Sequence, residues 1–259
     1  MTPELRNIDY FLGFLTILPW ALTLWVCYPK DVPVSRKVLA VVGGLTLGWI
    51  ATECILIIHP KIWPETSTFV KPKGTILTQT LHIAFIQAGM MEEGFKILFH
   101  LILGFSFSYS FKNRTWNKDI VMQGAFVALG FALIENSQYL FREEDSNKKF
   151  LLFLARSVYS ANIHLLINLC FGFFLLKSNG IEDFKERAIY VLWGFVLAII
   201  QHGVADFFLL PGSSFGSWIC EGLFVGIWVW VVRDWHNYLY PNSNFFHQNN
   251  LKDWEPEKN

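Results

Sequence analysis

The sequence predicts an all-α membrane protein, a polytopic bundle of about seven transmembrane helices, with six to eight as the range. Of its 259 residues 53% are hydrophobic and only 16% are charged, which lies outside the composition of ordinary soluble domains. Basic and acidic side chains number 21 each, so no net charge is available to attract nucleic acid. Seven apolar stretches are each long enough to cross a hydrocarbon core of about 30 Å. They cover residues 8–28, 37–59, 76–107, 119–141, 150–177, 186–210 and 215–233.

The connectors between these stretches are short and polar, which excludes an inserted soluble domain. We therefore expect one integral membrane domain over residues 1–234, with its chemistry in a core of 76–210, and a solvated tail over 235–259. No small-residue cleavage site follows the stretch 8–28, so we expect it to be retained as a span. The stretch 76–107 is longer than a perpendicular crossing requires, which predicts a tilted or kinked helix.

Loop charges predict the orientation. If the N-terminus lies outside, twelve Lys and Arg residues fall on the cytoplasmic side and seven on the other, which favours a multi-pass cell-membrane protein with a cytoplasmic C-terminus. Two glycine pairs, Gly44 with Gly48 and Gly222 with Gly226, have the spacing that lets helices pack closely. We expect this packing within one chain, and therefore a monomer or a weak dimer.

Eight ionisable side chains inside the apolar stretches are the strongest functional signal. A charged group at the centre of a membrane costs about 2.5–3.5 kcal/mol on insertion scales, so such groups generally mark a site. One or two could merely join helices, but two adjacent carboxylates together with two histidines exceed what joining needs. The eight are Glu92, Glu93, Lys96, Glu135, Arg156, His164, His202 and Asp206.

Helical spacing predicts which of these side chains meet. Glu92 stands four residues before Lys96 and can reach it. His202 and Asp206 are also four apart, so Asp206 could orient the imidazole and fix its tautomer. The third stretch carries a polar face at steps of three, four and seven residues. That face comprises His82, Gly89, Glu93, Lys96 and His100.

Four motifs, each on its own predicted helix, occur in a specific order. They read MMEEGFK, GFALIENSQYL, RSVYSANIH and QHGVADF, and they resemble the PrsW family of intramembrane proteases, which is distantly related to the CAAX prenyl proteases. The family patterns are EExxK, GFxxxEN, Arg followed eight positions later by His, and HxxxD. The CAAX relatives carry EExxxR and FxxxH, whereas this chain has Lys96 as the basic residue and Ser160 four positions before the histidine.

The resemblance implies an intramembrane endopeptidase that cleaves a membrane-anchored protein, such as an anti-sigma factor, near its extracytoplasmic side. By this resemblance Glu92 or Glu93 activates a water, while His164 and His202 stabilise the oxyanion or protonate the leaving amine, with Asp206 orienting His202. Lys96 would tune the carboxylates. Glu135, Asn136 and Arg156 would bind the substrate backbone or brace the helices, and we favour bracing.

Other interpretations stay open at this stage. Glu92 or Glu93, of which we name Glu93, could form a zinc site with His164 and His202 and leave an open position for water. Because the chain lacks HExxH, we favour a glutamic mechanism without a metal cofactor. A proton-coupled transporter would also place Glu, His and Asp within spans. No inverted repeat is visible, which counts against it. A catalytically inactive membrane scaffold is disfavoured because every candidate catalytic position is filled.

Overall fold

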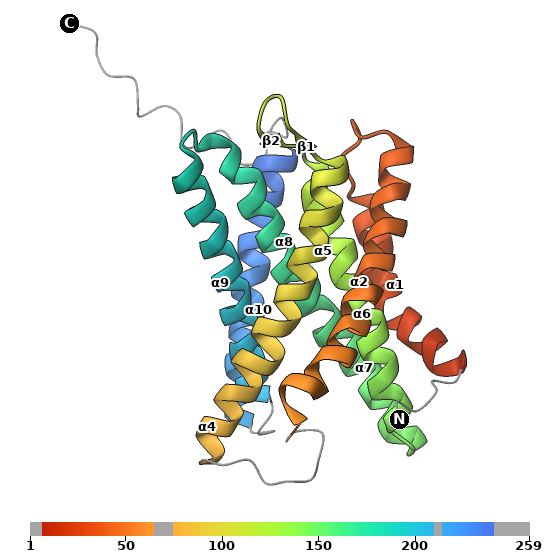
Figure 1. Cartoon of the computed structure of the whole chain (residues 1–259). Helices are drawn as coiled ribbons and strands as arrows, with labels where there is room; N and C mark the ends of the chain where they lie inside the picture. Colours follow the sequence, from red (N-terminus) through yellow and green to blue (C-terminus); the bar gives the residue numbers. More distant parts are fainter. Residues whose placement is uncertain (1–6, 65–74, 210–213, 241–259) are drawn as a thin grey trace, which may run out of the picture.

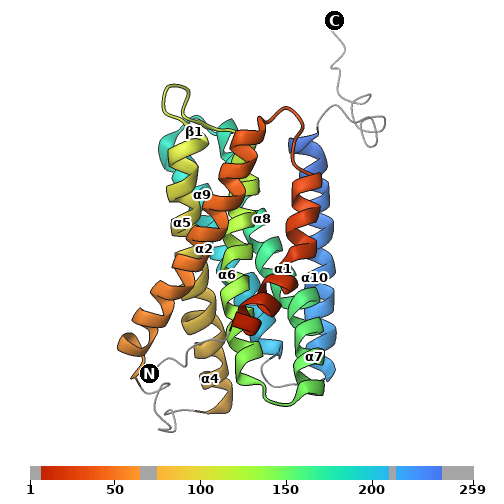
Figure 2. The same ribbon diagram turned by 90° about the vertical axis from the view of Figure 1, so that its right-hand side faces the viewer.

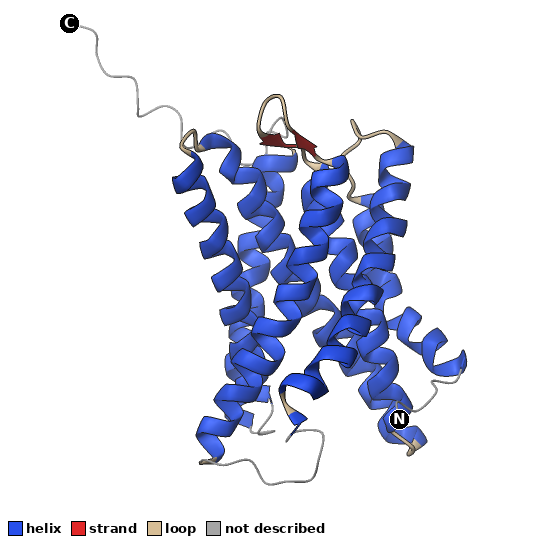
Figure 3. Ribbon diagram, viewed as in Figure 1, coloured by secondary structure: helices blue, strands red, loops and turns tan. Residues whose placement is uncertain are grey.

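The structure, a computed structural model, describes residues 7–64, 75–209 and 214–240. It is an all-α bundle of seven helical rods with one short hairpin at one end (Figures 1 and 3). The predicted fold class is therefore confirmed. We call the end that carries the hairpin the hairpin end.

Three of the seven rods are composite. The single-piece rods are α1 (Asn7–Val26), α2 (Val34–Ile62), α6 (Asp119–Arg142) and α9 (Phe184–Leu209); the third rod joins α4 (Ile76–Leu81), the π-helical η1 (His82–Met90) and α5 (Met91–Phe107). The fifth joins α7 (Ser146–Ala155), the π-helical η2 (Arg156–Ser160), α8 (Ala161–Lys177) and the 3₁₀ turn η3 (Ser178–Gly180), and the last joins α10 (Ser214–Asp234) to the π-helical η4 (Trp235–Leu239). The hairpin pairs β1 (Tyr109–Ser110) with β2 (Thr115–Trp116).

Six helices of the described chain are long and apolar enough to cross a membrane. The remaining rod, residues 76–107, has comparable length but carries Glu92, Glu93 and Lys96 near its middle. A multi-pass membrane protein is therefore confirmed.

Helix α6 is the centre of the bundle, enclosed by α1, α2, α5 and α8 (Figure 2). Every residue from Asp119 to Ala132 is buried. The glycines of α2 explain its close approach to α6, since a Cβ atom on Gly48 would lie 2.1 Å from the carbonyl oxygen of Val127 and one on Gly44 would lie 2.5 Å from Phe126. The predicted packing of this glycine pair within the chain is thus observed.

Two expectations fail at α10. Cβ atoms on Gly222 and Gly226 would meet nothing within 4 Å, so this glycine pair does not pack against the described part of the chain. The tail expected from residue 235 begins later, because residues 235–239 continue the last rod as η4 and bury Leu239. The rest of the predicted tail, 241–259, lies outside the described residues.

The extra length of the third rod is absorbed by η1. A π-helix bonds each residue to the fifth along instead of the fourth, so it shifts the phase of the helix faces on either side of it. Glu93, Lys96 and His100, all after η1, share one buried face as predicted. His82 lies on a different, exposed face, where the Gln87 amide nitrogen donates to its Nδ1 at 3.1 Å. The predicted polar face is therefore right on one side of η1 and wrong on the other.

Candidate active site

Close packing of η1 against α9 places the glutamates beside His202. A Cβ atom on Gly89 would lie 3.1 Å from the backbone oxygen of Ile199, and one on Gly203 would lie 2.3 Å from the ring of Phe85. A side chain at position 89 would crowd the α9 backbone and one at position 203 would displace the Phe85 ring, so glycine at both positions favours this close approach. The site therefore forms where η1 ends and α5 begins.

Glu93 is the fully buried hub of the cluster. Its Oε1 accepts from Nζ of Lys96 at 2.5 Å and from Nδ1 of His202 at 2.6 Å, and its Oε2 accepts from the amide of Asn168 at 3.3 Å. Both oxygens are occupied, and the side chain is 0% exposed. Glu93 is therefore placed to hold other groups in position.

Glu92, its neighbour, is placed differently. Its Oε2 lies 3.6 Å from Nε2 of His202 and 3.9 Å from Nζ of Lys96, and it has no hydrogen-bond partner in the described structure. The side chain is 17% exposed. Glu92 thus has a buried carboxylate oxygen without a hydrogen-bond partner beside His202 and Lys96, in a side chain that is otherwise partly exposed.

His164 stands on the other side of Lys96. Nδ1 of His164 lies 2.9 Å from Nζ of Lys96, and Nε2 lies 2.9 Å from Oε2 of Glu135. Because an ammonium can only donate, Nδ1 accepts and the proton of the neutral ring sits on Nε2, facing Glu135. The His164 and His202 rings lie 5.2 Å apart between centroids. The structure therefore brings together the two histidines and both glutamates.

Asp206 touches His202 from one turn away, with Oδ2 at 3.4 Å from Nε2. It does not hold the other nitrogen, as an orienting partner would. That position belongs to Glu93, whose Oε1 accepts a hydrogen bond from Nδ1–H of His202. Glu93 thus fixes the tautomer, and Asp206, 33% exposed, lines the open side of the site.

Glu135, Asn136 and Arg156 form a second layer of contacts. Arg156 pairs with Glu135 at 2.7 Å and donates from Nε to the Asn136 amide oxygen at 2.6 Å. The Asn136 amide nitrogen then donates to Thr16 of α1 at 2.8 Å. These contacts join α1, α6 and η2, an arrangement that suits a role in holding the helices together.

Comparison with known proteins identifies the family of the chain. Residues 36–233 match the sequence model of the PrsW family, described as intramembrane metalloproteases. The chain belongs to the PrsW family. It is 31% identical to the protease PrsW of Clostridioides difficile over 204 residues, 79% of this chain and 80% of that protein.

Other PrsW proteases are similar over the same extent. The protein from Shouchella clausii is 27% identical over 80% of this chain and 86% of its own length, and that from Bacillus subtilis is 25% identical over 83% and 88%. No solved structure matches the chain. The chain is thus a PrsW-family intramembrane protease of the multi-pass kind.

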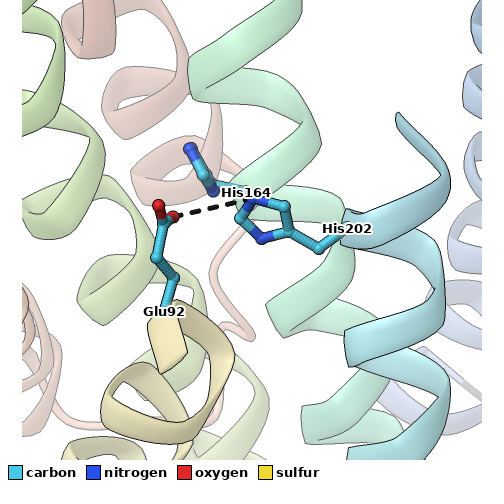
Figure 4. Close-up of side chains that lie close together, drawn as sticks. All are labelled: Glu92, His164 and His202. Atoms are coloured by element: carbon cyan, nitrogen blue, oxygen red, sulfur yellow. Dashed lines mark ion pairs between the residues drawn. The ribbon is translucent and has the colours of Figure 1, made fainter. Parts of the chain in front are cut away.

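The family description raises the question of a metal. Glu92, His164 and His202 offer ligand atoms that lie within 4.8 Å of one another (Figure 4). Of the two glutamates that the sequence leaves open as a zinc ligand, the structure places Glu92, not the named Glu93, with the histidines. One carboxylate and two imidazoles are the donors of many zinc peptidases.

The observed contacts fit a metal only in part. Oε2 of Glu92 has no hydrogen-bond partner, and Nε2 of His202 is the nitrogen that Glu93 leaves uncontacted, with the Asp206 carboxylate 3.4 Å from it. His164 is not available: one of its nitrogens accepts from Lys96 and the other donates to Glu135. As arranged, the three residues do not make a three-ligand site.

Two contacts in the site involve residues that are not among the predicted site residues. Asn168 bonds Glu93, and the Phe131 ring lies 4.4 Å below Nζ of Lys96 and packs on His164. Asn168 stands four residues after His164, a spacing that could have identified it. Phe131 lies inside the GFALIEN motif and looks like an ordinary core residue by composition.

Proposed function

We propose that this PrsW protease cleaves a membrane-anchored protein of the anti-sigma-factor type, near the extracytoplasmic side, with water activated by Glu92. The observation that carries the proposal is the contrast between the adjacent glutamates: every oxygen of Glu93 is occupied, whereas Oε2 of Glu92 has no hydrogen-bond partner. A general base needs a free oxygen within reach of the water that it deprotonates.

The chemistry follows from these positions. Glu92 takes a proton from water, and the resulting hydroxide attacks the scissile carbonyl carbon. The oxyanion that forms accepts a hydrogen bond from Nε2–H of His164. For this the imidazole ring turns from Glu135 toward the oxyanion. The proton on Glu92 passes to the leaving amine, directly or through Nε2 of His202 at 3.6 Å, and the C–N bond breaks.

The remaining residues hold this geometry. Glu93 keeps His202 in one tautomer and holds Lys96 between the two glutamates. Arg156 and Asn136 fix Glu135 and, through it, the ring of His164. Bound substrate would enter between partly exposed groups, Glu92, Asp206 and Glu135.

A zinc-dependent protease is the second candidate, favoured by the free Glu92 oxygen opposite His202 and by the family description. It would require His164 to release Lys96 or Glu135. When bound, zinc would polarise the scissile carbonyl and activate water. The family assignment argues against the hypothesis of a proton-coupled transporter.

Purified full-length protein in proteoliposomes, incubated with a single-span substrate, tests the proposal. We expect wild type and Glu221→Gln, an exposed glutamate of α10, to cleave the substrate near the outer end of its span in the presence of a chelator. Glu92→Gln should not cleave it. Chelator-sensitive activity that returns with zinc, together with one zinc bound per chain, would overturn the metal-free mechanism. Absence of cleavage by wild type of any single-span substrate would overturn the substrate class.

Orientation is part of the proposal, with the N-terminus outside and the C-terminus in the cytoplasm. The loop-charge difference supports it. Labelling of single cysteines introduced at Lys148 and at Arg114, which lie at opposite ends of the bundle, tests it in whole cells. An impermeant reagent should reach position 148 only, and labelling of position 114 alone would reverse the orientation.

A further inference from the structure

Lys96 is fully buried in the site, and its ammonium group has three N–H groups to place. One donates to Oε1 of Glu93 at 2.5 Å and one to Nδ1 of His164 at 2.9 Å. Oε2 of Glu92 lies 3.9 Å from Nζ, which is too far for a hydrogen bond. The contact that the third N–H makes therefore decides whether Lys96 stays apart from Glu92.

An aromatic ring accounts for the third N–H. Nζ of Lys96 lies over the ring of Phe131, 4.4 Å from its centroid and well inside the roughly 6 Å at which an aromatic face attracts a cation. Phe131 is 2% exposed, and this attraction is strongest where both partners are out of water. The same ring contacts His164, with the ring centroids 5.3 Å apart and the planes inclined by 64°. Phe131 therefore touches two polar members of the site at once.

Packing against α2 holds Phe131 in place. Thr52 donates from Oγ1 to the backbone oxygen of Phe131 at 3.4 Å, and a Cβ atom on Gly48 would lie 2.5 Å from the backbone nitrogen of Phe131. Phe126, earlier on α6, is buried as well, but the cation–ring contacts of the described chain do not include it. Filling of the core alone therefore does not explain why a ring at position 131 lies against Lys96.

We propose that Phe131 is a positioning residue, whose ring holds the Lys96 ammonium group apart from Glu92 and so keeps Oε2 of Glu92 free. The inference rests on the proposed function, in which that oxygen takes a proton from the attacking water. Without the ring, the third N–H of a buried cation would lack an acceptor, which is costly. A shift of about 1 Å would bring it within hydrogen-bond distance of Oε2 of Glu92. An oxygen paired in that way is no longer free to act as a general base.

Fluorine on the Phe131 ring tests this role, because fluorine withdraws electron density from the ring face while the side chain nearly keeps its shape. Mono-, di- and trifluorophenylalanine are incorporated at position 131 of the full-length protein, and at position 126 as the matched control. In proteoliposomes with a single-span substrate, we expect kcat to fall stepwise along the series at position 131, by about tenfold for trifluorophenylalanine, with KM unchanged. The series at position 126 should leave both constants at wild-type values.

Thermal unfolding tests the position of Lys96 without any substrate. With Phe131 present, Glu92→Gln should leave the Tm unchanged, because Oε2 of Glu92 has no hydrogen-bond partner in the described chain. With trifluorophenylalanine at position 131, Lys96 should pair with Glu92, so the same Glu92→Gln change should lower the Tm by roughly 3 °C or more. Trifluorophenylalanine at position 126 should not make the Tm depend on Glu92.

The two measurements separate this inference from the proposed function. A kcat that stays constant along the series at position 131, or falls equally at position 126, would overturn the inference. An effect of Glu92→Gln on the Tm that is the same with phenylalanine and with trifluorophenylalanine at position 131 would also overturn it. If wild type cleaves no single-span substrate while the Tm depends on Glu92 only with trifluorophenylalanine at position 131, the proposed function fails and the placement of Lys96 by Phe131 stands.

Discussion

The two halves of α6 show how one helix serves stability and chemistry in separate regions. From Asp119 to Ala132, toward the hairpin end, every residue is buried, and Ile120, Phe126 and Leu129 are 0% exposed. Beyond Ala132 the helix carries Glu135, Asn136 and Ser137, whose partners lie on α1, η2 and α8. The first half is fixed by apolar packing and the second by paired charges.

The difference between the two halves of α6 shows where the fold can hold buried ionisable groups. A close-packed apolar half holds the helices rigidly, so that the polar half can keep buried charges in fixed pairs. Changes in the first half, apart from Phe131, which packs on Lys96 and His164, should therefore alter stability alone. Changes in the second should alter activity, and stability only where a buried charge loses its partner.

Lys96→Met should have the largest combined effect on folding stability and on cleavage. Lys96 is 0% exposed and is the partner of Glu93, so its removal leaves a buried carboxylate short of a cation. We expect a loss of about 3–5 kcal/mol of folding free energy, a fall in Tm of roughly 6–20 °C, together with loss of cleavage. Thermal unfolding in detergent measures it, with the exposed Lys148→Met as control. An unchanged Tm in Lys96→Met would remove the argument that the charge pair stabilises this half.

Gly48→Leu should disrupt the apolar half. A Cβ atom there would lie 2.1 Å from the Val127 carbonyl oxygen, so α2 must move away from α6. Overpacking of this kind costs about 1–3 kcal/mol and occasionally more. Gly222→Leu, where a Cβ meets nothing within 4 Å, is the matched control and should keep the wild-type Tm. Equal Tm values for the two variants would contradict the close packing of α2 on α6.

Sequence patterns predicted the apolar half well and the polar half incompletely. The seven rods followed from hydropathy, because span length is set by membrane thickness. The polar half depends on η1, and a period of 3.6 residues cannot reveal a π-helix, so His82 was placed on the wrong face. The pairing of Glu93 with Nδ1 of His202 depends on the approach allowed by Gly89 and Gly203 and has no signature in spacing.

The smallest effect concerns Tyr28, just beyond α1 at the hairpin end. Burial and the adjacent Asp119 carboxylate raise the pKa of the Tyr28 hydroxyl, which favours the neutral phenol in the folded chain. The stability from this shift is present below the unfolded pKa of about 10 and is lost as pH rises above it. Wild type should therefore lose more Tm than Tyr28→Phe between pH 9 and 11, with exposed Tyr159→Phe behaving as wild type. A larger loss of Tm in Tyr28→Phe than in wild type over this pH range would contradict the predicted direction of the pKa shift.

Adjacent glutamates with different partners are the central claim, and cleavage rate and Tm measured together for Glu92→Gln and Glu93→Gln test it most directly. Glu92→Gln should lower turnover by about 10²–10⁴ with an unchanged Tm, because it removes a general base whose Oε2 has no hydrogen-bond partner. Glu93→Gln should lower both, because Lys96 and His202 lose their shared partner. More than a tenth of wild-type turnover in Glu92→Gln, or equal Tm values for the two variants, would contradict the account.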